Sequence, residues 1–274
     1  MKPGVYPGLS RAEYEVIPAA NYSTLKHFNL SPAHAREYMI HPPEPSKAME
    51  FGTALHSAIL EPTKFKKEYI VAPTVDRRTK EGKAAWVAFE AEHPGGNYLS
   101  TDEMEGCNTI IKGIDENETA TLLLRGEGKN EMCVVWVDEE TGLLCKGLID
   151  RFTSLFGWGV VVDIKSTVSA FPPMFAAQSA RMSYHVQAAF YIDGLNAVAP
   201  SERRFITLAI EKTRPFCMSA FEYDEQAISE GRAAYRRYLN EYNSCKETGK
   251  WPGYPAGINP LSLPKWAIKD QSYE

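Results

Sequence analysis

Two aspartates and a lysine form the pattern in this sequence with the clearest chemical meaning. Asp150 lies near the end of one expected strand. Asp163 lies on the next expected strand, with twelve residues between the two aspartates, and Lys165 follows two positions later. Side chains at i and i+2 of a strand share a face, so Asp163 and Lys165 do, and Asp150 joins them if the strands are neighbours. Carboxylates suit Mg²⁺, and a lysine beside them can orient or deprotonate a water. Two strand-end acids with a lysine partner would give the same spacing without catalysis.

Other candidate residues lie on expected helices and on another strand. Tyr184, Gln187 and Tyr191 are spaced to share one helix face, where they could hold a sugar–phosphate backbone or a catalytic residue. A face of packed aromatics is the simpler alternative. His56 lies among small and apolar residues, where a histidine is more often a hydrogen-bonded core residue than a ligand. Glu131 heads a strand and is uninformative alone.

A mixed sheet and its helices must position these residues. The pattern predicts an α/β fold with one domain over 1–274: a mainly helical part over 1–100, an αβ core over 101–250 and an irregular tail over 251–274. Phe171-Pro-Pro starts a long helix that reaches about Ala197, and Thr79 precedes a helix from Lys80 to about Glu92. Strand composition marks 131–137, 143–152, 158–165, 204–211 and 216–222.

Composition excludes several classes of protein. The chain has 274 residues, 30 basic and 35 acidic side chains and a net charge of −5, which argues against a generic polycation that coats nucleic acid. No apolar run approaches the roughly 18 residues of a membrane span, and the N-terminus lacks the apolar core of a signal peptide, so we expect a cytoplasmic protein with no membrane partner. Its 5 cysteines form no CxxC pair, which indicates buried thiols.

Four segments occur in an order that resembles a known family. They are GTALHSAILEP (52–62), NEMCVVWVDEETGLLCKGLIDRF (130–152), VVDIKST (161–167) and YHVQAAFY (184–191). Together they resemble the exonuclease VIII (RecE-type) nuclease domain of the PD-(D/E)XK superfamily. The likeness runs from about residue 5 to 268. It implies a restriction-endonuclease-like core, a mixed central sheet flanked by helices.

The resemblance also implies a role for each motif residue. Asp150, Asp163 and the carbonyl of Ile164 would be metal ligands, and Lys165 would position or activate the attacking water. His56 corresponds to a histidine that RecB-like members place at the metal, and Glu131 to an auxiliary carboxylate. Gln187 and Tyr191 match a Q-x3-Y motif that supports the active site and the bound strand.

The activity implied by the resemblance is a 5′-to-3′ exodeoxyribonuclease on double-stranded DNA ends. It would use Mg²⁺, for which Mn²⁺ can substitute, release 5′ mononucleotides and leave 3′ single strands. Family members work as rings through which DNA threads, so we expect a homo-oligomer. The partner expected for recombination is a single-strand annealing protein of the RecT type.

A polar segment is the candidate for contact with DNA. Arg77, Arg78 and Lys80 lie beside an expected helix start, and we predict a mobile arm with the two arginines on phosphates. A surface ion pair of Arg78 with Glu81 or Glu90 is the alternative. Tyr184 is a further candidate contact to the bound strand.

Two other functions stay open at this point. A RecB-like nuclease that acts on single strands or flaps would use the same residues, although its iron–sulfur version needs a cysteine cluster near the C-terminus. A non-catalytic DNA-binding ring protein is the second alternative, and the intact Asp150, Asp163 and Lys165 argue against it.

Overall fold

The computed structural model describes residues 1–264, and the last part of the expected C-terminal tail, 265–274, lies outside them. Within 251–264 the tail has no helix or strand, as expected. The elements in chain order are β1 (Gly4–Pro7), α1 (Arg11–Glu15), α2 (Tyr22–Leu25), the 3₁₀ helix η1 (Lys26–Asn29), α3 (Pro32–Ile40), α4 (Lys47–Leu60), α5 (Pro62–Glu68), β2 (Tyr69–Val71), α6 (Lys80–Glu92), β3 (Asn97–Leu99), α7 (Thr101–Glu116), α8 (Glu118–Arg125), β4 (Gly128–Val137), β5 (Leu144–Leu155), β6 (Trp158–Thr167), α9 (Pro172–Met182), α10 (Tyr184–Val198), β7 (Arg203–Glu211), β8 (Met218–Glu222) and α11 (Glu225–Thr248).

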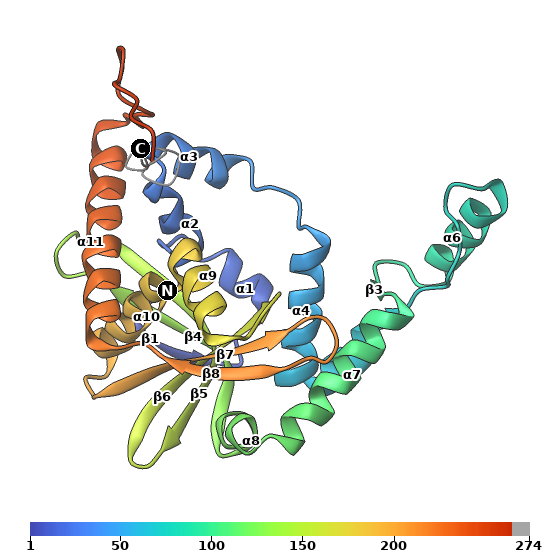
Figure 1. Cartoon of the computed structure of the whole chain (residues 1–274). Coiled ribbons are helices and arrows are strands. Elements are labelled where there is room, and N and C mark those ends of the chain that lie inside the picture. Colours follow the sequence, from blue (N-terminus) through green and yellow to red (C-terminus); the bar gives the residue numbers. More distant parts are fainter. Residues whose placement is uncertain (265–274) are drawn as a thin grey trace, which may run out of the picture.

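The central sheet has six strands in the order β1-β4-β5-β6-β7-β8 (Figure 1). Neighbouring strands in this sheet run antiparallel, except that β6 and β7 are parallel and are joined through α9 and α10. Such a connection needs a crossover, which the two helices supply. The predicted α/β fold with a mixed sheet flanked by helices is confirmed.

Helices cover both faces of the sheet and enclose two apolar cores. On one face, α10 and α11 pack against the sheet together with α2, η1 and α3, around buried side chains such as Phe190 and Tyr235. On the other face, α4, α7 and α8 enclose a second core that includes Leu55 and Ile110. The sheet between these layers therefore carries its central strands away from solvent, where charged side chains need partners.

The prediction of one long helix from Phe171 to about Ala197 is wrong. It is two helices, α9 and α10, because Ser183 between them adopts the left-handed conformation, with φ of 58°. The hydroxyl of Tyr22 donates to the carbonyls of Met182 and Ser183, at 3.0 and 2.8 Å. A partner from the distant N-terminal part thus satisfies carbonyls that an unbroken helix would have used itself.

The mainly helical part also contains three strands that the sequence analysis missed. β1 pairs with β4 at the edge of the central sheet, whereas β2 and β3 form a separate two-stranded parallel sheet. These strands have 3 or 4 residues, too few for a period of two to stand out. No helix within residues 1–264 is both long and apolar enough to cross a membrane.

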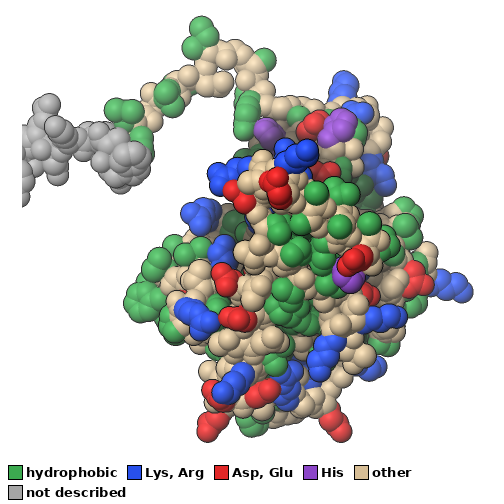
Figure 2. All heavy atoms as spheres, turned by 90° about the vertical axis from the view of Figure 1, so that its right-hand side faces the viewer, with side chains coloured by type: hydrophobic (Ala, Val, Ile, Leu, Met, Phe, Trp, Pro, Cys, Tyr) green, Lys and Arg blue, Asp and Glu red, His purple; other side chains and the backbone are tan. Residues whose placement is uncertain are grey.

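The segment from β2 to β3 projects from the body as an arm, which we define as residues 69–99 (Figure 1). Its helix α6 spans Lys80–Glu92, as predicted, and Thr79 caps it by accepting from the Gly82 N–H. Figure 2 looks onto the side from which the arm projects, and shows basic side chains interspersed with acidic ones.

Candidate active site

The two aspartates lie where neighbouring central strands separate. β5 and β6 pair antiparallel, and the last pair of their ladder is Arg151 opposite Val162. Asp150 and Asp163 occupy the next opposite positions. The Ile164 N–H, which has left the ladder, donates to Asp150 Oδ2 at 2.7 Å. The end of the β5–β6 ladder therefore brings both carboxylates to one place.

Asp163 is the most enclosed carboxylate of the site, with 3% of its surface exposed. Lys165 Nζ donates to its Oδ1 at 2.9 Å, and Gln187 Nε2 donates to the same oxygen at 3.0 Å. The lysine comes from the same strand and the glutamine from α10, so the sheet and the helix together fix the carboxylate. Lys165 and Gln187, two of the candidate residues from the sequence, thus both contact Asp163.

His56, Glu131 and Asp150 form a second group at the same point. One ligand atom from each lies within 4.8 Å of the others, and this is the one group of three or more such side chains found among residues 1–264. The β4–β5 register places Glu131 opposite Asp150, and α4 brings His56 Nδ1 to 3.4 Å from Asp150 Oδ2. His56 Nε2 lies 2.9 Å from the carbonyl oxygen of Ile164.

The charges of the site influence one another strongly. Burial and the nearby Asp150 carboxylate raise the pKa of Glu131 to about 7. Burial opposes protonation of His56, but the Asp150 carboxylate outweighs it and raises the pKa of the imidazole. Burial raises the pKa of Asp150, but His56, Lys165 and the Ile164 N–H lower it further than burial raises it. The carboxylates therefore need positive charge beside them, which His56, Lys165 and a cation can supply.

The donor set fits a divalent cation. Asp163 Oδ2 is buried and accepts no hydrogen bond within the described part of the chain, although Lys165 Nζ lies 2.8 Å from it. The Lys165 ammonium therefore already lies beside this oxygen, which has a further lone pair that can accept an ion or water. The 2.9 Å contact between His56 Nε2 and the Ile164 oxygen is a hydrogen bond, which holds that carbonyl beside the carboxylates. Carboxylates and a carbonyl suit Mg²⁺ or Mn²⁺.

The two tyrosines of α10 have different surroundings. Tyr184 is half-buried, and Lys165 Nζ lies 5.0 Å from the centre of its ring. Tyr191 is buried and packs on β5, where a Cβ at Gly147 would lie 3.0 Å from its ring. Tyr184 therefore borders the site, whereas Tyr191 supports α10 against the sheet.

Two residues near the site were missed from the sequence. Tyr22 belongs to α2 and Lys26 to η1. Burial and the nearby Asp163 carboxylate raise the pKa of Tyr22, and burial and the positive charge of Lys165 lower the pKa of Lys26. The two residues stand four positions apart, and this spacing was a weak signal because it is common in any helical segment.

The basic residues of the arm do not converge on this site. Arg78 pairs with Asp76 at 3.0 Å, not with Glu81 or Glu90. Arg77 places its guanidinium carbon 4.0 Å from the centre of the Trp86 ring. Lys80 is exposed at the first residue of α6.

Comparison with known proteins identifies the family. A family model described as a PDDEXK-like domain of unknown function (DUF3799) matches residues 21–262. The chain belongs to this PDDEXK-like family. The match includes every site residue named above and most of the sheet. It supports a nuclease, and PDDEXK nucleases generally use a divalent metal. No curated protein matches the chain.

Solved structures add a likeness of fold. A crystal structure of a "putative exonuclease" from Eubacterium rectale has a TM-score of 0.53 and 14% identity, and the match covers 89% of this chain and 91% of that one. The structure of SSO0001 has a TM-score of 0.27 and 16% identity, over 68% of this chain and 85% of that chain. The first match shows a shared fold, and the second is too weak to carry an argument.

Proposed function

We propose that this chain is a Mg²⁺-dependent exodeoxyribonuclease of the RecE type that degrades one strand of duplex DNA from its 5′ end. The observation that carries the proposal is the meeting of Asp150, Asp163 and Lys165 with His56 and Glu131 at one point of the sheet, in a chain of the PDDEXK-like family. The order of the four segments described above supports the RecE type.

Each side chain has a task in phosphodiester hydrolysis. The chemistry that a bound divalent cation supplies is neutralisation of charge on the reacting phosphate and activation of a water. This cation would be held by Asp150, Asp163, Glu131, His56 and the carbonyl of Ile164.

Lys165 acts on the other reactants. An ammonium group has three donors, and the hydrogen bond to Asp163 Oδ1 takes one of them. The other two can orient the attacking water and donate to a phosphate oxygen. Gln187 keeps Asp163 in place, and Tyr191 packs the helix that carries the glutamine against the sheet. Tyr184 borders the path of the bound strand.

The assembly and the partner are part of the same proposal. A ring-shaped homo-oligomer would thread DNA and would need positive charge mainly inside, which agrees with a net charge of −5. Arg77, Arg78 and Lys80 on the arm would contact DNA where it enters. The 3′ single strand that remains would be bound by a single-strand annealing protein of the RecT type.

Cleavage of a 5′-labelled duplex, with Mg²⁺ and with excess chelator, tests the function. We expect labelled 5′ mononucleotides with Mg²⁺, binding without turnover with Ca²⁺, and no product from a folded Asp163→Asn variant. Products from single strands or flaps alone would favour a RecB-like nuclease. DNA binding without any product would favour the non-catalytic ring protein, and full activity in chelator would refute the metal site.

A further inference from the structure

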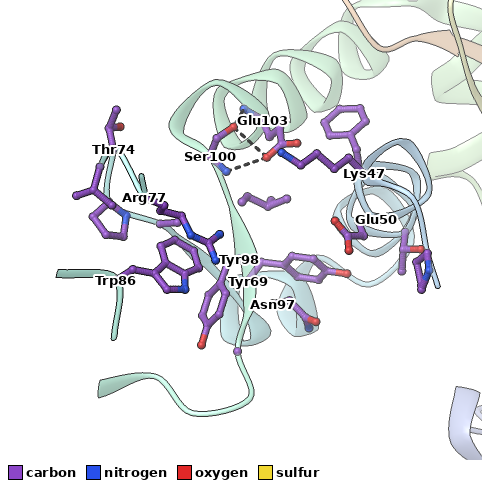
Figure 3. A pocket seen from close by; sticks show the side chains of 18 residues that line it. Lys47, Glu50, Tyr69, Thr74, Arg77, Trp86, Asn97, Tyr98, Ser100 and Glu103 are labelled. Atoms are coloured by element: carbon purple, nitrogen blue, oxygen red, sulfur yellow. Dashed lines mark hydrogen bonds between the residues drawn. The ribbon is translucent and has the colours of Figure 1, made fainter. Parts of the chain in front are cut away.

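A pocket of about 810 Å³ lies between the arm and helices α4 and α7, outside the catalytic group (Figure 3). Arg77, Trp86, Tyr98 and Tyr69 gather on one side of it, and Lys47 and Glu50 of α4 lie across from them. Its size is within the range of roughly 300–1,000 Å³ of ligand sites. Aromatic rings and a few polar groups are the lining that flat, polar-edged molecules need.

The aromatic wall is held by contacts within the arm. The ring centroids of Trp86 and Tyr98 are 5.7 Å apart with planes at 85°, and Phe89 lies 5.7 Å from Trp86 and 5.1 Å from Tyr98. Trp86 Nε1 is buried and has no hydrogen-bond partner in the described part of the chain. The indole is therefore oriented by its neighbours, while its own donor is unused.

Arg77 is positioned by a tight turn. Thr79 donates through both its N–H and its hydroxyl to the Asp76 carbonyl, each at 3.0 Å. This turn packs directly on α6, because a Cβ at Gly82 would lie 2.0 Å from that carbonyl oxygen. With the turn fixed, the Arg77 guanidinium stacks on Trp86 at 4.0 Å and forms a planar cationic surface.

Helix α4 connects this pocket with the catalytic group. Thr53 lines the pocket, and His56 lies one turn later on the same helix. Gly52, which precedes Thr53, faces β6 so closely that a Cβ would lie 3.2 Å from the Oγ of Ser166, the residue after Lys165. A DNA strand whose phosphate reaches Lys165 would thus pass α4 on its way to the arm.

The charges of the lining favour a base over a phosphate as the occupant. Lys47 and Arg77 are balanced by Glu50 and Glu103, and Glu103 already accepts from Ser100. A site without net positive charge holds a phosphate weakly. Unpaired bases instead stack on aromatic rings and on arginine planes, and their edges take hydrogen bonds from polar side chains.

We propose that this pocket holds an unpaired nucleobase of single-stranded DNA, stacked on the platform that Arg77 and Trp86 form. The inference rests on the proposed function in that DNA is the ligand. It adds a site for the unpaired part of the substrate strand, at least one turn of α4 away from His56 of the catalytic group. Asn97 and Glu50 can take the polar edge of the base.

The test is binding of the full chain, in excess chelator, to two fluorescent probes with equal charge. One probe is a short oligodeoxythymidylate, and the other is the same backbone with abasic sites. Trp86→Leu should weaken binding of the first probe about 5- to 150-fold, from roughly 1–3 kcal/mol per stacked base, and leave the second unchanged. Trp86→Phe should keep most of the affinity.

Val87→Ala is the matched control, because Val87 is 64% exposed on the same helix and does not line the pocket. Equal affinities of Trp86→Leu and Val87→Ala for oligodeoxythymidylate would overturn the inference. Equal losses on both probes would also overturn it. If Trp86→Leu unfolds the arm, Arg77→Leu should give the same base-dependent loss, and its absence would be decisive.

The binding assay needs no cleavage, so it separates this inference from the proposed function. A chain that binds bases through Trp86 but never cuts DNA would refute the nuclease and keep the pocket. A chain that cuts DNA, and in which Trp86→Leu behaves like Val87→Ala, would refute the pocket and keep the nuclease.

Discussion

Replacement of Gln187 by leucine tests whether the hydrogen bond to Asp163 has a role in catalysis. The amide donates to Asp163 Oδ1 at 3.0 Å, inside the protein, and Lys165 is the other donor to that oxygen. Leucine has a similar size and keeps the packing of α10, but it donates nothing. The carboxylate would then be held from one side alone.

The expected size of the effect follows from this contact. A hydrogen bond to a charged group contributes roughly 1.5–3 kcal/mol. If this free energy serves to hold Asp163 in its reactive position, its loss slows cleavage about 10- to 150-fold, at about 1.4 kcal/mol per factor of ten. Loss of a group that orients a metal ligand typically costs 10–100-fold in affinity or activity. We therefore expect Gln187→Leu to need more Mg²⁺ as well.

The assay is the cleavage rate of a 5′-labelled duplex over a Mg²⁺ titration, together with a thermal unfolding curve. Gln178→Leu is the matched control, because Gln178 on α9 accepts from the Thr167 hydroxyl at 2.9 Å. A normal rate and an unchanged Mg²⁺ requirement in Gln187→Leu would refute the reasoning. A fall in unfolding temperature with unchanged Mg²⁺ dependence would make Gln187 a purely structural residue.

Three further predictions concern catalysis, DNA contact and packing. Lys165→Ala should lower the cleavage rate by roughly 10²–10⁴ with little change in DNA binding; equal losses in single-turnover rate and binding affinity would make it a phosphate anchor. The double variant Arg78→Ala/Lys80→Ala, which leaves the pocket lining intact, should flatten the log–log salt dependence of DNA binding by nearly two units, and an unchanged slope would leave the arm as ordinary surface. Gly231→Ala should lower the free energy of unfolding by about 1–3 kcal/mol in a denaturant titration, because the new Cβ would lie 2.3 Å from the His185 carbonyl oxygen; an unchanged midpoint would contradict the close contact of α10 and α11.

Local patterns were sufficient wherever the physical cause was local. Helix α6 begins and ends at Lys80 and Glu92 as expected, since Thr79 offers the cap and the helix period follows directly. Asp163 and Lys165 had to share a face, because they are two residues apart on one strand. The order of motifs along the chain likewise indicated the superfamily without any coordinates.

Contacts between distant segments depended on the tertiary structure. His56 meets the carbonyl of Ile164, 108 positions away, because α4 packs on the sheet at that point. The break at Ser183 depends on Tyr22, 161 positions before it, which takes the carbonyls that the break releases. The spacing of residues within one helix says nothing about contacts with segments more than a hundred positions away.

The arm shows the same division most clearly. The sequence by itself determined a basic turn followed by a helix, because the signals for both lie within a few residues. Only the folded chain placed the Arg77 guanidinium on Trp86 and opened a pocket toward α4. The physical reason is that side-chain stacking depends on how the turn, the helix and the strand β3 pack on one another, and spacing along the chain does not specify that packing.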